Sequence, residues 1–359
     1  MHTIAACNSL HTARPITPAQ EWYSSDGYGL DVAARDSELR RSVANLGGGF
    51  TRKHSHGKDY WYYQWKLPDG VPRQIFVGPD DSQTRDLMAR HSAPEKVLEL
   101  AALLKLTRAA LEYGCSEIPI KHGRIIGRLL DHGFFKAGGI LVGTHAFLAY
   151  QNMFGIRWNS GAYTLDIDFA HAGRKLSLAI ASNVVMDTTK AIDSLEMGFI
   201  PVASKTTFKK PDEPDLDLDF LTTCGPAGDE PVFLKSLNLT LQPLKFMELS
   251  LEDPMKSTLL VRNGPLVVNI PRPQRFALHK LIVHGERSLD QRTKSTKDLV
   301  QAAALLDYLF DHDADLVKES WLDVSSRGPG WQQRLNAGWK SLTKTFPDQN
   351  FQERLDGAV

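Results

Sequence analysis

Two segments of the chain place aspartate at every second position, between apolar residues. In TLDIDFA these aspartates are Asp166 and Asp168, and in PDLDLDFLT they are Asp215, Asp217 and Asp219. Alternate side chains of a strand share one face and lie roughly 6 to 7 Å apart, given a rise of about 3.3 Å per residue. Carboxylates held that close repel each other unless a cation neutralises them or one takes up a proton. Mg²⁺ fits because it binds a few carboxylates and takes its other ligands from water and phosphate.

The second acidic segment supplies a third carboxylate but leaves its identity open. Asp217 and Asp219 both point to the polar face of the expected strand. Asp215 lies at its beginning, where a charge discourages the pairing of an edge strand with other chains. The bland alternative for both segments is a charged, solvated face of an ordinary strand.

A glycine and a threonine lie upstream, where a strand turns into a helix. Residues 140–142 form a short apolar run, which predicts a buried strand, and a helix is expected from Thr144 to Gly155. The first turn of a helix exposes unpaired N–H groups and the positive end of its dipole. Because Gly143 has no side chain, a phosphate could approach closely. Alternatively, this glycine only permits a tight turn.

Two helices are expected before this turn. Ser92 and Glu95 form a capping box ahead of an amphipathic helix that ends near Gly114. A second helix is expected at residues 124–132, and Gly133 supplies its left-handed C-cap.

The segment between the acidic strands predicts a helix and a pair of strands. Asp187 caps the helix and Gly198 closes it, and the strand pair is expected at residues 199–210. This order allows the two acidic strands to be neighbours in one antiparallel sheet.

Aromatic and β-branched runs at residues 49–79, separated by HGKD and PDG, predict a small antiparallel β module. Its basic and aromatic residues are Arg52, Lys53, His54, His56, Lys58, Tyr60, Trp61, Tyr62 and Tyr63. Such a mixture suits stacking on bases and pairing with phosphates. The alternative is that the aromatic side chains replace a missing core. Downstream, DLVQAAALLDYLF predicts a helix in the C-terminal region.

The composition predicts a globular protein without a strong overall field. The 359 residues include 42 basic and 42 acidic side chains, so no net charge draws the chain to nucleic acid or to a membrane. The three cysteines have no disulfide or zinc spacing, and no signal peptide or membrane span is recognisable, which favours a cytoplasmic protein without a membrane partner. We expect three regions, at residues 1–90, 91–235 and 236–359. Four histidines match no zinc pattern and are assigned no role: His145, His171, His279 and His284.

The Gly-Thr turn, the D-x-D strand and a further aspartate on an adjacent strand resemble the nucleotidyltransferase fold of the DNA polymerase β superfamily. LVGTHAF, TLDIDFA, LDLDFLT and VVNIPRPQRFALHKLIV resemble a bacterial nucleotidyltransferase-like family, related more distantly to abortive-infection and tRNA-modifying toxin nucleotidyltransferases. The resemblance covers roughly residues 120 to 310. Thr144 stands where many relatives have serine, and the 22 positions from it to Asp166 exceed the spacing of minimal enzymes.

The resemblance implies a site and a fold. It assigns catalysis and two Mg²⁺ ions to three aspartates: Asp166, Asp168 and Asp219, with Asp217 as the alternative third ligand. It assigns nucleotide binding to four residues: Gly143, Thr144, Lys280 and Asp298. Taken singly, Lys280 could be a surface lysine and Asp298 a helix-terminal charge. The implied fold is an α/β (α+β) core with a mixed or antiparallel sheet and flanking helices, the N-terminal β module and a C-terminal helical region.

The implied activity is Mg²⁺-dependent transfer of a nucleoside monophosphate from a triphosphate such as ATP to an acceptor hydroxyl, with release of pyrophosphate. The acceptor would be RNA such as tRNA, or protein. A toxin-like or defence role would add an antitoxin or operon partner. The alternative is a catalytically inactive module of this fold that binds nucleic acid or a protein, because a fold alone does not establish an activity.

Overall fold

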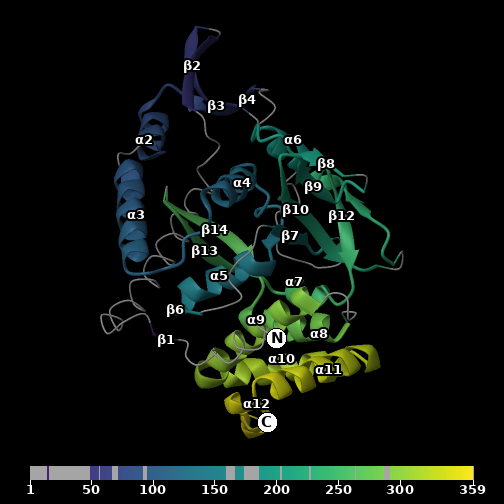
Figure 1. The fold of residues 1–359 in the computed structure, drawn as a ribbon. Coiled ribbons are helices and arrows are strands. Elements are labelled where there is room, and N and C mark those ends of the chain that lie inside the picture. Colours follow the sequence, from purple (N-terminus) through teal and green to yellow (C-terminus); the bar gives the residue numbers. More distant parts are fainter. Residues whose placement is uncertain are drawn as a thin grey trace.

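The computed structural model describes residues 14–15, 49–55, 57–66, 72–91, 95–158, 166–173, 186–202, 204–225, 228–262, 264–286 and 292–358. The small β module lies at one end, a sheet with helices around it occupies the middle, and helices gather at the C-terminal end (Figure 1). The predicted α/β class with a mixed sheet is confirmed. The division into three regions stays a prediction.

A seven-stranded mixed sheet carries the acidic segments. Its main path runs in the order β11 (Val232–Leu234), β12 (Leu239–Leu244), β10 (Glu213–Thr223), β7 (Ile167–His171) and β5 (Gly139–Leu141). Strand β9 (Thr207–Lys210) pairs with the first part of β10, and β8 (Ile200–Pro201) pairs with β9. Strand β10 is parallel to β7 and β12, whereas β5 and β9 run antiparallel to their neighbours.

The two acidic strands are neighbours, but the expectation that they run antiparallel is wrong. Strands β7 and β10 are parallel. The segment between them contains α6 (Thr188–Asp193) and the β8–β9 pair. Such a long connection can return the chain to the end of the sheet at which β7 begins, and a parallel neighbour must begin there too. The antiparallel neighbour of β10 is instead β9, which reaches it through a tight turn.

Aromatic and branched residues of both acidic strands pack below the sheet. Phe169 and Phe220, which are in register on β7 and β10, stack with ring centroids 5.2 Å apart. Phe134 packs edge-on against Phe169 at 5.4 Å, and all three rings are fully buried. Because this face of β7 and β10 is buried, the aspartates that alternate with these residues lie on the opposite, polar face of the strands.

The predicted helices before and after the Gly-Thr turn are present. Helix α4 (Ile120–Asp131) is followed by Gly133 with φ +88°, and α5 (Gly143–Phe154) ends on Gly155 in the left-handed conformation. The predicted left-handed C-cap at Gly133 and the predicted helix end at Gly155 are thus confirmed.

Two other expected helices are also present. Helix α3 (Glu95–Glu112) stops before Gly114, while Ser92 of the predicted capping box lies outside the described residues. Helix α6 is capped by Asp187, as predicted, and the carboxylate of this residue accepts from the backbone N–H of Lys190 at 3.0 Å. It ends at Asp193, earlier than the predicted closure at Gly198.

The C-terminal region is mainly helical, as predicted. Its helices are α7 (Glu248–Leu251), α8 (Pro273–Glu286), α9 (Arg292–His312), α10 (Ala314–Ser326), α11 (Pro329–Thr345) and α12 (Phe351–Ala358), with short 3₁₀ turns η2 (Lys235–Leu237) and η4 (Pro347–Gln349). A hairpin of β13 (Met255–Val261) and β14 (Gly264–Ile270) precedes α8 and was not predicted.

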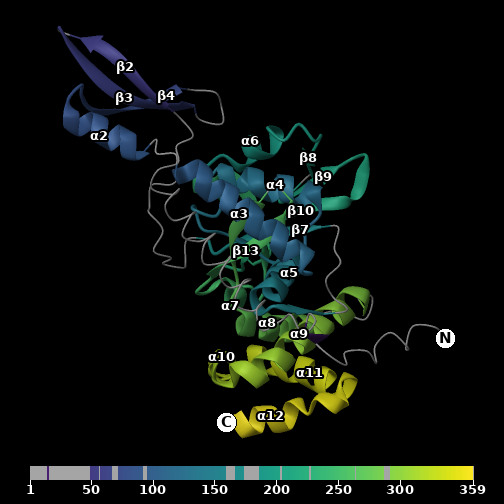
Figure 2. The ribbon, with the colours of Figure 1, turned by 90° about the vertical axis from the view of Figure 1, so that its left-hand side faces the viewer.

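The N-terminal β module is an antiparallel meander, as predicted. Its strands are β2 (Gly49–Ser55), β3 (Lys58–Lys66) and β4 (Pro72–Pro79), followed by helix α2 (Ser82–His91). Figure 2 shows the module projecting from one end of the molecule. A separate short pair joins β1 (Arg14–Pro15) to β6 (Ile156–Arg157). Across the described ranges, no helix is long and apolar enough to cross a membrane.

Candidate active site

A cavity of about 220 Å³ lies where the acidic strands and the start of α5 face α8 and α9. It is lined by Val142, Gly143, Thr144, Asp166, Asp168, Asp219, Leu221, Leu244, Met247, Ser250, Phe276, His279, Lys280, Val283, Lys297 and Asp298. The lining thus includes every site residue predicted from the sequence except the alternative ligand Asp217. Segments more than 150 positions apart in the chain converge there.

Gly143 begins α5 in a conformation that side chains rarely adopt. Its φ is +63°, and a Cβ atom there would lie 2.1 Å from Oδ2 of Asp168. The glycine is therefore needed because a carboxylate occupies the adjacent space. The close approach expected for a phosphate is, in the structure, that of Asp168. Gly143 and Thr144 of the first turn of α5 line the same cavity, and a helix N-terminus favours an anion through its unpaired N–H groups and dipole.

Asp168 and Asp219 face the cavity as register partners on parallel strands. The hydroxyl of Thr207 on β9 donates to Oδ1 of Asp219 at 2.6 Å, which holds this carboxylate in place. Asp166 lies immediately before β7, two positions before Asp168 in the chain. The polar edges of β7 and β10 therefore bring three carboxylates to one cavity.

The alternative ligand Asp217 lies elsewhere along β10. It is the register partner of Lys209 on β9, and Nζ of Lys209 lies 2.6 Å from its Oδ2. It shares a face with Asp219 but lies two positions, or roughly 6 to 7 Å, earlier in the strand. Geometry therefore favours Asp219 as the third carboxylate.

The surroundings of Asp168 change its pKa. Burial, followed by the charges of Asp219 and Asp166, raises the pKa of Asp168 to about 6, against the lowering effect of Lys280 and Lys297. The ionised form of Asp168 is thus unfavourable in the protein without a bound cation.

Lys280 and Asp298 form a partly buried ion pair between α8 and α9. Nζ of Lys280 lies 2.7 Å from Oδ1 of Asp298, and their side chains are 16% and 4% exposed. The same ammonium lies 5.2 Å from the ring centre of Phe276, one helical turn earlier. Lys280 is therefore held at the cavity and does not extend over the surface.

Lys297 also lines the cavity and was not predicted. Burial and then the charge of Lys280 lower its pKa, while the carboxylates of Asp168, Asp298 and Asp166 raise it. Its position beside Asp298 in KSTKDL was the available signal. Periodicity could not reveal it, since which face of α9 meets the cavity depends on how α8 and α9 pack.

The apolar part of the cavity lining was also missed, and this apolar wall comprises Leu221, Leu244, Met247 and Phe276. Ser250 lies among these residues, and its buried hydroxyl has no hydrogen-bond partner among the described residues. This wall offers an apolar surface with one polar group beside the charged side of the cavity.

The donor set is compatible with divalent cations. Within the described ranges no group of three ligand side chains is already arranged around one metal position. The cavity nevertheless gathers four carboxylates against two ammonium groups, an excess of two negative charges. Carboxylate oxygens are the ligands that Mg²⁺ prefers. Asp166, Asp168 and Asp219 are the carboxylates that would hold it, and Asp298 is paired with Lys280.

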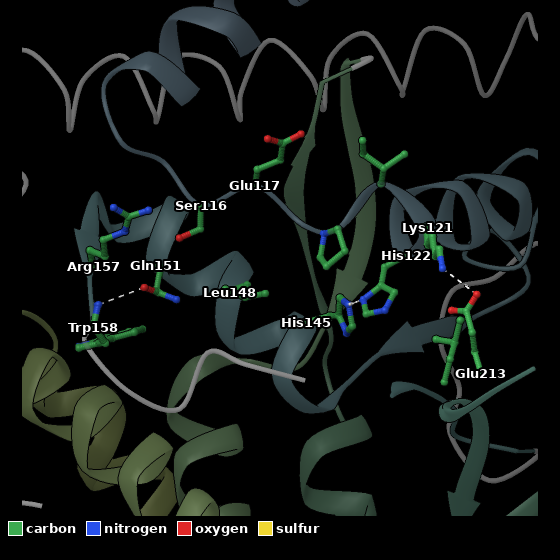
Figure 3. A pocket seen from close by; sticks show the side chains of 13 residues that line it. Ser116, Glu117, Lys121, His122, His145, Leu148, Gln151, Arg157, Trp158 and Glu213 are labelled. Atoms are coloured by element: carbon green, nitrogen blue, oxygen red, sulfur yellow. Dashed lines mark hydrogen bonds and ion pairs between the residues drawn. The ribbon is translucent and has the colours of Figure 1, made fainter. Parts of the chain in front are cut away.

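A larger cavity of about 690 Å³ opens near another part of α5 (Figure 3). It contains none of the predicted site residues. His122 and His145 share a hydrogen bond of 3.0 Å there, and burial lowers the pKa of His145 to about 3, so this ring is neutral. Lys121 is paired with Glu213 at 2.7 Å. The smaller cavity, with its unbalanced carboxylates, is the stronger candidate for chemistry.

A comparison with protein families bears on this cavity. A family model described as Nucleotidyltransferase matches residues 121–326, which is more than half of the chain and includes all the site residues named above. No curated protein and no solved structure matches the chain.

Proposed function

The chain belongs to this nucleotidyltransferase family, and on that premise we propose that it transfers a nucleoside monophosphate from a triphosphate to an acceptor hydroxyl, releasing pyrophosphate, in a reaction that depends on Mg²⁺. The observation that carries the proposal is the in-register pair Asp168 and Asp219, which faces one cavity together with Asp166, the Gly143 turn and Lys280.

Asp166, Asp168 and Asp219 are the proposed metal ligands. When bound there, Mg²⁺ would stabilise the charge on the attacking and leaving oxygens. One divalent ion would balance the excess of two negative charges in the cavity. A second ion matches the further charge that a triphosphate brings, and we therefore propose two ions.

The other polar groups of the cavity would bind the triphosphate. The first-turn N–H groups of α5 at Gly143 and Thr144 face the phosphates, and the dipole of the helix adds to this attraction. Lys280 and Lys297 supply two positive charges on the other side. Asp298 holds the ammonium of Lys280 in position through their 2.7 Å contact. The apolar wall with Ser250 is the proposed place for the sugar and base.

In the proposed reaction the acceptor oxygen attacks the α-phosphorus, and the bond from that phosphorus to the bridging oxygen of the β-phosphate breaks. Pyrophosphate leaves with the electron pair of that bond. Asp219 is the proposed acceptor for the hydroxyl proton, and its hydrogen bond from Thr207 orients it. Positioning and electrostatics provide most of the catalysis in such phosphate chemistry, so few residues are needed.

The finer assignments rest on the motif resemblance. The acceptor is proposed to be RNA, such as tRNA, or protein. A defence-type role with an antitoxin or operon partner in the cytoplasm is supported by the resemblance alone, and by no contact of the structure.

The test uses each of the four triphosphates labelled at the α-phosphate, with Mg²⁺ and either total RNA or protein extract. Wild type should label one acceptor class, and a γ-label should appear in pyrophosphate and never in the acceptor. Asp168→Asn and Asp219→Asn should reduce labelling by about 100-fold or more, as expected when an electrostatic contributor to the transition state is lost. Asp217→Asn is the matched control and should stay within a few fold of wild type.

Two results would contradict the proposal. Undiminished labelling by Asp168→Asn would show that this cavity is not the site of the reaction. Absence of labelling by folded wild type with every triphosphate and both extracts would instead favour the non-catalytic alternative, a module that only binds.

A further inference from the structure

The three-stranded sheet of the β module has two faces of different character. Register pairs place Lys53 opposite Tyr60, and Tyr62 opposite Phe76. Because side chains alternate along each strand, these four residues share one face, and Lys58 joins them. We call these five residues the aromatic face. Arg52, Trp61 and Tyr63 belong to the opposite face.

The opposite face already contains a small core and the acidic side chains. Helix α2 lies against it, since a Cβ at Gly78, the partner of Trp61, would meet the side chain of Thr84. Tyr63 is buried there and packs edge-on against Phe50 at 5.1 Å.

Ion pairs reinforce this covered side. Asp80 pairs with Arg52 at 3.0 Å and with Arg85 of α2 at 2.7 Å, and it accepts from the indole N–H of Trp61 at 2.9 Å. Asp59, the one acidic residue within β2, β3 and β4, also pairs with Arg52. The module therefore satisfies its packing and its carboxylates on this side.

The aromatic face is partly exposed, with Tyr60 and Tyr62 half-buried, and it carries no carboxylate from the three strands. Phe76 is 57% exposed, and its ring centre lies 5.9 Å from that of Tyr60 and 5.6 Å from that of Tyr62. Nζ of Lys53 lies 5.2 Å from the ring centre of Tyr62, and Lys53 and Lys58 are both exposed. Since the core of the module lies on the other side, core packing does not account for two tyrosine rings in contact with Phe76 here.

The chemistry of this face matches a polyanion with flat bases. Exposed aromatic rings stack on bases of any sequence, and nearby ammonium groups pair with phosphates. Lysine is depleted in protein–protein interfaces, so the pairing of lysines with aromatic rings favours nucleic acid over a protein surface. RNA presents its unstacked bases in loops and at ends, where aromatic side chains reach them.

We propose that the aromatic face binds single-stranded RNA through stacking on Phe76, Tyr60 and Tyr62 and phosphate contacts from Lys53 and Lys58. That this RNA is the acceptor of the nucleotide rests on the function proposed above. The binding itself does not depend on catalysis.

The test measures binding of a fluorescein-labelled oligouridylate of 20 nucleotides to the full chain by anisotropy. The double variant Tyr62→Ala/Phe76→Ala should bind at least about 30-fold more weakly, from roughly 1 kcal/mol or more for each of two stacked bases. Lys53→Gln/Lys58→Gln should reduce the slope of log K against log salt by about 1.4, from about 0.7 per phosphate contact to a single strand.

Matched controls separate this face from general effects. Phe233→Ala removes a ring that is also 57% exposed, on β11 of the central sheet, and should bind as wild type. Lys340→Gln/Lys344→Gln removes two exposed charges from α11 and should leave the salt slope unchanged. Unchanged thermal unfolding of the full chain, the β module included, would show that the variants retain their fold.

Several results would overturn the inference. The first is that wild type does not bind the oligouridylate, and the second is that the Tyr62→Ala/Phe76→Ala protein binds it as tightly as wild type does. The third is that Phe233→Ala weakens binding as much as Tyr62→Ala/Phe76→Ala does. The fourth is that wild type binds oligothymidylate or a duplex more tightly than the oligouridylate. Asp168→Asn distinguishes this inference from the proposed function, because it should bind RNA as wild type does while losing transfer. Binding without transfer by wild type would therefore retain the aromatic face and refute only the activity.

Discussion

Replacing Asp168 by asparagine should stabilise the metal-free protein while abolishing its activity. The pKa of Asp168 is raised from its ordinary value of 3.8 to about 6, chiefly by burial and then by the charge of Asp219. The native protein therefore binds a proton more tightly than the unfolded chain does, and its stability falls as pH rises from about 4 to about 6. Above pH 6 the full penalty is present. At 1.36 kcal/mol per pH unit it amounts to about 3 kcal/mol.

The measurement is urea unfolding in EDTA at pH 7.5 and at pH 4.5. At pH 7.5, Asp168→Asn should exceed wild type in unfolding free energy by up to about 3 kcal/mol, and at pH 4.5 most of this difference should vanish because Asp168 is protonated in the native state. Adding Mg²⁺ at pH 7.5 should raise wild-type stability, by about 2.7 kcal/mol at 100 times the Kd, and leave the variant nearly unchanged.

Asp217→Asn is the matched control for this experiment. It removes a carboxylate from the same face of β10 but breaks an ion pair with Lys209. It should therefore lower stability slightly, by up to about 1 kcal/mol, and should not respond differently to Mg²⁺. The reasoning fails if Asp168→Asn is no more stable than wild type at pH 7.5 in EDTA, or if its advantage is the same at both pH values.

Three further outcomes are expected from the cavity. Asp219→Ala should reduce nucleotide transfer at least about 100-fold, while Asp217→Ala should retain most of it, as measured by incorporation of α-labelled nucleotide. Equal losses in the two variants would contradict the assignment of Asp219 as the third ligand. Gly143→Ala should destabilise the protein by more than about 1 kcal/mol in urea unfolding and should weaken Mg²⁺ binding. The reason is that φ is positive at this position and the added methyl group would lie 2.1 Å from Oδ2 of Asp168. An unchanged metal affinity by calorimetry would argue against this contact. Lys280→Met should raise the KM for the triphosphate and cost about 3 kcal/mol of stability, because it leaves the buried carboxylate of Asp298 without the ammonium of Lys280. The double variant Lys280→Met/Asp298→Asn should recover part of that stability. A double variant no more stable than Lys280→Met would contradict the pairing.

Features set by local sequence were predicted well. The turn at Gly143 follows from an apolar run that ends on a glycine, and the left-handed residues Gly133 and Gly155 close their helices as expected. The alternation around Asp166 and Asp168 established which side of the strand is polar. Each of these features depends on neighbours within a few positions.

Features set by distant contacts were missed or left open. The hairpin β13–β14 and the position of Lys297 beside Lys280 follow from packing between elements far apart in the chain. The aromatic rings of the β module could not be divided between core and surface until α2 was seen to cover one face.

The sequence by itself determined which side chains share a face, because alternation has a period of two residues and is local. It could not choose between Asp217 and Asp219, since shifting a strand by two positions leaves that pattern unchanged. The tertiary structure decided the register by packing Phe220 against Phe169, and with it the parallel pairing that sets Asp219 beside Asp168. A strand's own residues specify its polar face, whereas the partner opposite each carboxylate depends on the long-range pairing of strands.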